Sequence, residues 1–173
     1  MEVHIDEIES PVGKIVLAET GGALCALDFE EGPEPVLARL KRRYGALQAR
    51  PGNGVRELRD RLEAYFQGDL KALDGLPVEP GGTPFQRDVW SALQRIPAGS
   101  TTSYSELAAS IGRPSAVRAV GMANSRNPIA VVIPCHRVVG RDGSLTGYAG
   151  GLERKRWLLR HEGYFPQAEL QLF

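Results

Sequence analysis

A Pro/Gly-rich segment, Asp74-Gly75-Leu76-Pro77-Val78-Glu79-Pro80-Gly81-Gly82, divides the 173-residue chain near its middle. Proline and glycine at this density end helices and strands, so the segment predicts a linker between two folded parts. The charge changes at the same place, because residues 1–82 carry 10 Lys/Arg and 15 Asp/Glu whereas residues 83–163 carry 11 and 5. We therefore expect an N-terminal domain over 1–75, a linker over 76–82, a C-terminal domain over 83–163 and a tail over 164–173.

The N-terminal half combines strand and helix patterns. Residues 15–18 and 23–27 are apolar runs on either side of Thr20-Gly21-Gly22, which predicts a β-hairpin. Apolar side chains at helical spacing predict one helix that begins at Pro35 and another over residues 55–66. This half is therefore expected to be a mixed sheet-and-helix domain.

The C-terminal half begins with a well-defined helix start. Thr83 can cap the helix, Pro84 suits its first position, and Gln86 completes a capping box. Pro97 should end this helix, because a proline cannot continue it.

Two more helices should follow at a short spacing. Ser103 and Glu106 form a second capping box, and Gly112-Arg113-Pro114 predicts a tight turn. Pro114 is expected to begin the next helix, which extends to Ala123. Helix, glycine-containing turn and helix are typical of a helix-turn-helix, although many helix pairs share the pattern without contacting DNA.

The second of these helices has a distinctive outer face. Arg118, Ala119 and Met122 are expected to point outward, whereas Val117, Val120 and Gly121 can point inward. One cation among small or flexible side chains suits close approach to a nucleic-acid groove. The alternative interpretation is an ordinary solvated arginine.

The apolar run Ile129–Ile133 leads directly to Pro134-Cys135-His136-Arg137. A run of this length, rich in β-branched residues, predicts a buried strand that Pro134 ends. Cys135 would then lie at the edge of the core, beside a base and a permanent cation. Because positive charge favours the thiolate, the motif predicts a nucleophilic cysteine.

The sequence alone leaves the chemistry of Cys135 open. Neighbouring strand residues point to opposite faces, so His136 would reach the thiol only through a bend in the backbone or through a water. A carboxylate should orient the imidazole, and Glu162 is a candidate that spacing does not favour over Glu106 or Glu153. Attack on a carbonyl would make the protein a cysteine hydrolase, whereas attack on an alkyl carbon would consume it after one transfer.

Composition excludes several other classes of protein. No apolar run approaches the roughly 18 residues of a membrane span, and the N-terminus does not resemble a signal peptide. The two cysteines, Cys25 and Cys135, are therefore expected to be reduced, with Cys25 in the core. No metal-ligand spacing is present, so we expect no metal and no cofactor. These features predict a cytoplasmic protein that does not bind membranes.

The C-terminal half also resembles a known family. Ile133-Pro134-Cys135-His136-Arg137-Val138-Val139 is similar to the signature of the O6-alkylguanine-DNA alkyltransferases (methylated-DNA–protein-cysteine methyltransferases). The resemblance covers essentially all of residues 83–163 and is looser in the N-terminal half, where Ser10-Pro11-Val12-Gly13 carries it. Further matching segments are Thr101-Thr102-Ser103-Tyr104, Arg118-Ala119-Val120-Gly121, Asn127-Pro128, Gly147-Tyr148-Ala149-Gly150-Gly151, Trp157-Leu158-Leu159 and His161-Glu162-Gly163.

The resemblance implies a fold and an activity. The fold would be α/β (α+β), with a small ribonuclease H-like domain of mixed sheet and helices and a mostly helical domain that contains a helix-turn-helix. Cys135 would accept an alkyl group from O6 of guanine, and less readily from O4 of thymine, in one irreversible transfer. His136 would act through a water as general base, oriented by Glu162, and Asn127 would brace the turn before the cysteine.

The resemblance also implies how double-stranded DNA is held. Arg118 would fill the base stack when the damaged nucleotide flips out, and Tyr104 would push the flanking phosphate and contact the base. Further expected DNA contacts are Ser103, Ala119, Gly121 and Met122. The alkyl pocket would be lined by Tyr148, Ala149, Gly150, Lys155 and Val138. The small Ala149 and Gly150 suggest room for groups larger than methyl.

Three further expectations concern partners and alternatives. The tail Glu169–Phe173 is similar to short peptides that dock on the replication sliding clamp, although packing on its own domain is the simpler interpretation. Some family members hold a structural zinc in the N-terminal domain, but only His4 and Cys25 are candidates here. The chain is expected to be monomeric, and the main alternative function is a lesion-binding protein without transfer activity, against which Cys135 argues.

Overall fold

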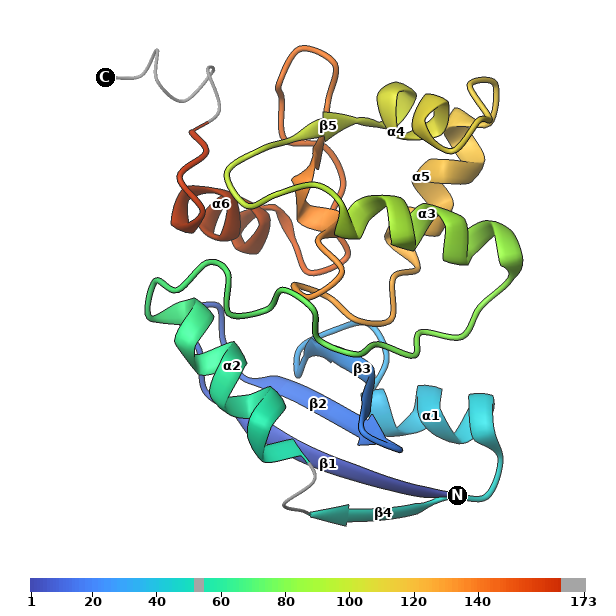
Figure 1. The fold of residues 1–173 in the computed structure, drawn as a ribbon, viewed down its shortest axis with the longest axis vertical. Coiled ribbons are helices and arrows are strands. Elements are labelled where there is room, and N and C mark those ends of the chain that lie inside the picture. The colour runs from blue at the N-terminus through green and yellow to red at the C-terminus, as the bar shows by residue number, and fades with distance from the viewer. Residues whose placement is uncertain (52–54, 166–173) are drawn as a thin grey trace. The chain divides into compact units, whose positions relative to one another are not determined.

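The computed structural model describes residues 1–51 and 55–165, so the tail considered above lies outside the described residues (Figure 1). Two compact units are present. Among the described residues, the first contains Met1–Gly81 and Pro128–Ala130, and the second contains Gly82–Asn127 and residues 131–165. The α/β fold with a sheet-containing first unit and a mostly helical second unit is confirmed.

The first unit is built on a four-stranded sheet of order β3-β2-β1-β4 (Figure 1). The first three strands are antiparallel, and β4 returns parallel to β1. The predicted hairpin and both predicted helices are confirmed, whereas β4 was not predicted. The elements are β1 (Glu2–Ile8), β2 (Ile15–Thr20), β3 (Ala23–Phe29), α1 (Val36–Tyr44), β4 (Gln48–Pro51) and α2 (Arg56–Phe66).

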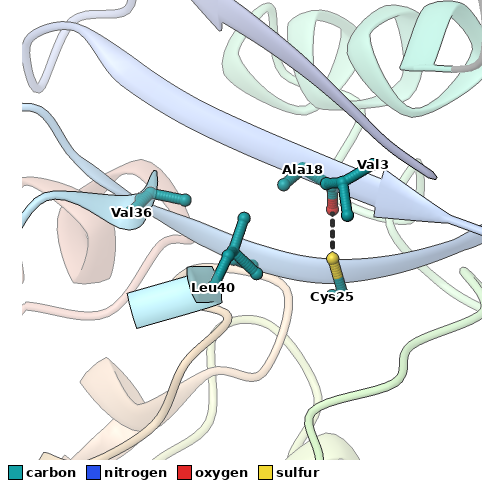
Figure 2. Packing of buried hydrophobic residues seen from close by; sticks show 6 residues of the cluster. Val3, Ala18, Cys25, Val36 and Leu40 are labelled. Carbon is teal, nitrogen blue, oxygen red and sulfur yellow. Dashed lines mark hydrogen bonds between the residues drawn. The ribbon is translucent and has the colours of Figure 1, made fainter. Parts of the chain in front are cut away.

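A helix covers each face of this sheet. Val36 and Leu40 of α1 pack against Val3 and Cys25 on one face (Figure 2). On the other face, Asp6 accepts a hydrogen bond of 2.9 Å from Arg59 of α2. The two faces follow from the alternation of side chains along β1.

Cys25 belongs to the core of this unit, as predicted. The residue is buried, and its Sγ lies 3.4 Å from the Ala18 carbonyl oxygen (Figure 2). Burial raises the pKa of the Cys25 thiol to about 11, so the group stays protonated near neutral pH. Cys25 is therefore a core residue without the thiolate that reactivity needs.

The second unit is mostly helical. The capping box of Thr83 and Gln86 begins α3 as predicted, and Trp90 of α3 donates a hydrogen bond of 2.9 Å to the Ala123 carbonyl of α5. The elements are α3 (Pro84–Gln94), β5 (Thr102–Ser103), α4 (Tyr104–Ser110), α5 (Val117–Ser125), the 3₁₀ turn η2 (Cys135–Arg137), β6 (Val138–Val139) and α6 (Leu152–His161).

Two sequence predictions for the C-terminal half of the chain are wrong in detail. α5 begins at Val117 rather than Pro114, because residues 114–116 form a turn with no side-chain cap. The run Ile129–Ile133 is buried as expected but is not a strand: apart from one bridge between Ile129 and Leu27, it forms turns. A short apolar run signals burial more reliably than it signals extended backbone.

Candidate active site

The backbone bends sharply before Cys135. Val131 has φ +69°, which is the left-handed region that β-branched residues rarely adopt. Asn127 Nδ2 donates a hydrogen bond of 2.7 Å to the Ile133 carbonyl and so braces the bend. Such strain persists only where surrounding contacts hold it, and it is common at functional sites. The cysteine therefore lies on a fixed turn.

The turn η2 carries three functional side chains that are consecutive in the sequence. Cys135, His136 and Arg137 are all buried, and the Cys135 amide bonds to the Ile133 carbonyl at 2.8 Å. The pleat of a strand would have separated Cys135 from His136, but a 3₁₀ turn rotates successive side chains by about 120°. This is the backbone bend that the sequence left open.

Glu162, at the C-terminal end of α6, is the carboxylate that meets His136. His136 Nε2 lies 3.0 Å from both Glu162 oxygens, and both side chains are fully buried. The Glu106 and Glu153 side chains are exposed instead. The opposite nitrogen of the ring, His136 Nδ1, is buried and has no hydrogen-bond partner among the residues the structure describes.

Arg137 completes this cluster, and sequence reasoning did not assign it there. Its Nε and Nη2 each donate a hydrogen bond of 2.8 Å to a different Glu162 oxygen, and its Nη1 donates one of 2.5 Å to the Ile96 carbonyl. The position of Arg137 directly after His136 could have indicated that it belongs to the site. The sequence could not show that Glu162 is its partner. The guanidinium is directed at Glu162, not at the thiol as the motif first suggested.

Burial and charge set the protonation states of the cluster. Burial lowers the pKa of His136 below 6.5, Arg137 and Lys155 act in the same direction, and Glu162 opposes them. Burial alone would raise the pKa of Glu162, but hydrogen bonds from Arg137 and His136 outweigh it and hold that pKa well below 4.5. The cluster therefore rests with neutral His136 and ionised Glu162 near neutral pH.

Lys155 of α6 is buried beneath the loop that precedes this helix. Its Nζ donates hydrogen bonds to the carbonyls of Val138, Thr146 and Gly147, at 2.5, 2.6 and 3.2 Å. Burial lowers the pKa of Lys155 to about 8, while the charge of Cys135 acts in the opposite direction. The ammonium joins the end of the cysteine turn to the segment before Tyr148.

The predicted pocket residues lie around this loop. Tyr148 and Gly150 are partly exposed and Ala149 is exposed, whereas Val138 is buried and presents its carbonyl to Lys155. Added Cβ atoms at Gly121 and Gly147 would each lie 3.7 Å from Tyr104 atoms. Tyr104 therefore lies close both to α5 and to this loop.

The helix-turn-helix is formed by α4 and α5. Arg118, Ala119 and Met122 are exposed on α5, as the outer face predicted. Ser103 is buried and its hydroxyl accepts a hydrogen bond of 3.1 Å from the Glu106 amide, so its side chain caps α4. Gly121 faces the Tyr104 ring, and an added Cβ there would lie 3.7 Å from it, at ordinary van der Waals distance.

Within residues 1–51 and 55–165, no group of three or more His, Cys, Asp or Glu side chains is arranged to hold a metal ion. Among the helices of the described segments, none is long and apolar enough to cross a membrane.

Fold and site together define a class of two-unit protein, in which a helix-turn-helix unit carries a buried cysteine beside a His–Glu pair. Family models agree with this description. Residues 84–164 match the model described as "6-O-methylguanine DNA methyltransferase, DNA binding domain", and residues 4–80 match its "ribonuclease-like domain". The chain belongs to the 6-O-methylguanine DNA methyltransferase family.

Individual relatives support this assignment over the whole chain. The methylated-DNA–protein-cysteine methyltransferase of Shigella flexneri is 47% identical over 165 residues, which cover 92% of this chain and 95% of that protein. The Mycobacterium tuberculosis H37Rv protein of the same name is 44% identical over 172 residues, 99% of each chain. A crystal structure of Mycobacterium tuberculosis OGT in complex with DNA matches with a TM-score of 0.80, 39% identity and full coverage of both chains.

Proposed function

We propose that this protein repairs O6-alkylguanine in duplex DNA, and less readily O4-alkylthymine, by irreversible transfer of the alkyl group to Cys135. Family membership supports the reaction, and one observation in the site carries the mechanism. His136 is held by Glu162 at Nε2 and presents a buried, unpartnered Nδ1. A base oriented at one nitrogen and open at the other can activate a nearby nucleophile.

Proton transfer from Cys135 is the first step of this mechanism. The unpartnered Nδ1 means that the Cys135 thiol makes no direct hydrogen bond to the ring, although the two residues are neighbours. A water between Sγ and Nδ1 would bridge them, and a buried polar site of this kind suits an ordered water. The thiol proton passes through that water to His136, and ionised Glu162 stabilises the resulting imidazolium.

Alkyl transfer then proceeds by displacement at the alkyl carbon. A bond forms between Cys135 Sγ and that carbon while the carbon–O6 bond breaks, and the electron pair of the broken bond leaves with the guanine. The guanine anion takes up a proton, and the proton that His136 received from Cys135 balances it. Because a thioether has no carbonyl for water to attack, the product is stable and each molecule acts once.

The buried position of Cys135 requires an extruded base. A stacked guanine cannot reach a buried sulfur, so the nucleotide must flip out at a cost of a few kcal/mol. The exposed Arg118 on α5 supports the role of the side chain that fills the stack, beside the exposed Ala119 and Met122. Gly121 and Ser103 would contribute to this surface through their backbone, because Gly121 faces Tyr104 and the Ser103 hydroxyl caps α4.

The loop that Lys155 holds supports a pocket for the flipped base. Tyr148, Ala149 and Gly150 follow directly after the two loop carbonyls that bind the ammonium, and Tyr104 lies near Gly147. Tyr104 would thus contact the base from the helix-turn-helix while Tyr148–Gly150 surround the alkyl group. Lys155 and Val138 would support the pocket through the hydrogen bond between Lys155 Nζ and the Val138 carbonyl.

Intact mass measurement after incubation with DNA that contains O6-methylguanine tests the proposal. The wild-type protein should gain one methyl group per molecule, and a Cys135→Ser variant should gain none. Cys25→Ser is the matched control and should react like wild type, since Cys25 is a core thiol with a raised pKa. DNA binding without any mass gain in the wild type would instead indicate a lesion-binding protein, and repeated turnover of an ester a hydrolase.

Three sequence predictions remain beyond this mechanism. Contact with a sliding clamp through Glu169–Phe173, a monomeric state and a cytoplasmic location are proposed from the sequence alone. Loss of clamp binding on deletion of residues 169–173 would support the first of them.

A further inference from the structure

Arg137 is the member of the buried cluster that takes no part in the reaction steps proposed above. Its three guanidinium nitrogens are all engaged, two on the Glu162 carboxylate and one on the Ile96 carbonyl. Its side chain is 11% exposed, whereas those of His136 and Glu162 are fully buried. Arg137 is therefore bound to Glu162 and to the segment that follows α3, with no guanidinium nitrogen left to face the thiol.

The two-pronged contact fixes the Glu162 carboxylate. Arginine binds both oxygens of a carboxylate with defined geometry, which a lysine cannot reproduce. A buried carboxylate without a cation would be costly and would draw a proton into the Glu162–His136 pair, where the imidazole is the more basic group. With Arg137 present, Glu162 stays ionised and both oxygens remain 3.0 Å from His136 Nε2.

Arg137 also contributes to the charge that His136 experiences, beside the larger effect of burial. The charged groups that face the imidazole are Glu162 and Lys155 from α6 and Arg137 from its own turn. Glu162 alone would favour an imidazolium, which cannot accept a proton from Cys135. Arg137 balances that negative charge, so the resting cluster of neutral imidazole, carboxylate and guanidinium has no net charge.

We propose, on the basis of the alkyl-transfer function above, that Arg137 is a positioning residue that holds Glu162 ionised and fixed so that His136 rests as a neutral base. Arg137 acts through Glu162 and touches neither the substrate nor the reacting sulfur. With Arg137 in place, Glu162 can orient the resting imidazole while that ring stays neutral. Glu162 can then stabilise the imidazolium once the Cys135 proton has arrived.

A titration of His136 by NMR in protein labelled at histidine tests this role. In Arg137→Met, the uncompensated Glu162 should raise the pKa of His136 by about one unit or more relative to wild type. The acidic limb of the pH profile for the alkyl-transfer rate should move to higher pH by the same amount. Arg141→Met, which removes an exposed cation from the same unit, is the matched control and should change neither.

Two further variants separate charge from geometry. Arg137→Lys keeps the cation but loses the two-pronged contact, so it should keep the low pKa of His136 and slow the transfer at every pH. The double variant Arg137→Met/Glu162→Gln removes the uncompensated carboxylate and should return the pKa of His136 toward the wild-type value. If Arg137→Met fails to fold, these two variants carry the test.

An unchanged His136 pKa in folded Arg137→Met would overturn the proposal, as would a raised pKa in Arg137→Lys. The titration reads the imidazole directly and needs no alkyl transfer. Failure of the proposed reaction would therefore appear as unmodified Cys135 in wild-type protein, whereas failure of the Arg137 role would appear as an unshifted His136 titration.

Discussion

At the residue scale, His136 shows how burial and hydrogen bonding oppose each other within one side chain. Removal from water disfavours the imidazolium, whereas the contact with Glu162 favours it, and burial prevails. The residue types of this site were evident from the sequence, because Cys135 and His136 follow an apolar run. The partner of Arg137 was not, since a contact across 25 positions depends on the tertiary fold.

The lowered pKa of His136 predicts acid sensitivity. Below pH 6.5 the unfolded chain protonates this residue while the folded protein does not, so the unfolded state binds more protons and the free energy of unfolding falls as the pH falls. Urea denaturation at pH 7.5 and 5.5 should show this loss, and His136→Gln should show a smaller one. An equal loss in the two proteins would contradict the prediction.

Lys155 is expected to stabilise the protein through its three carbonyl contacts. Lys155→Met keeps much of the buried side-chain volume but leaves the Val138, Thr146 and Gly147 oxygens without their donor. We expect the free energy of unfolding at pH 7 to fall by about 3 kcal/mol. Denaturant titration measures this change, and Lys71→Met, at an exposed position, should stay within about 0.5 kcal/mol of wild type.

At the element scale, local signals predicted the helices well and the short strands poorly. The Thr83 capping box begins α3 as its sequence indicates, because a cap depends on residues only three apart. The two-residue strands β5 and β6 pair only because the fold brings residues 102 and 138 together. The apolar run Ile129–Ile133 misled for a related reason: burial from several sides removes the alternation that identifies a strand.

Gly121 allows a test of how one residue affects the stability of a helix, because it lies inside α5 and its backbone does not require glycine. An added Cβ would meet the Tyr104 ring at 3.7 and 3.9 Å, which is ordinary van der Waals contact. Gly121→Ala should therefore raise the free energy of unfolding by about 0.5–1 kcal/mol and leave alkyl transfer intact. Denaturant titration together with the mass assay measures both.

Gly82→Ala is the contrasting variant. Gly82 has φ +80°, and a Cβ there would lie 2.6 Å from the Trp90 ring. This substitution should lower the free energy of unfolding by about 2 kcal/mol. Lower stability in Gly121→Ala would show that the Tyr104 ring does not accommodate the added Cβ, whereas failed repair in a stable Gly121→Ala protein would show that α5 needs the glycine for DNA.

At the scale of the whole molecule, the sequence predicted two folded parts from composition alone. The charge difference between residues 1–82 and 83–163 places the excess of cations in the half that contains both the helix-turn-helix and Cys135. Binding to phosphates and attack by the thiolate thus belong to the same unit, and a flipped base has only to reach residues of that unit. Net charge over the whole chain, which is zero, concealed this division.

Arg118→Ala should separate DNA engagement from chemistry. Loss of the exposed side chain on α5 should slow repair of O6-methylguanine in duplex DNA by about tenfold, since filling the stack offsets part of a flipping cost of a few kcal/mol. Reaction with free O6-benzylguanine, which needs no flipping, should stay near the wild-type rate. Equal losses with the two substrates would contradict the assigned role.

Lys155, through its three hydrogen bonds to carbonyl groups, has a consequence for how this chain tolerates insertions. Its ammonium joins the Val138 carbonyl to those of Thr146 and Gly147, so both ends of the segment between them are fastened independently of its tip. The entropy of closing such a loop rises only logarithmically with length, by about 0.6 kcal/mol for each doubling. Added residues beside the exposed Arg141 and Asp142 would lengthen a loop whose two ends are already tied. A peptide tag or a fluorescent reporter placed there would therefore leave the conformation of the Cys135 turn unchanged.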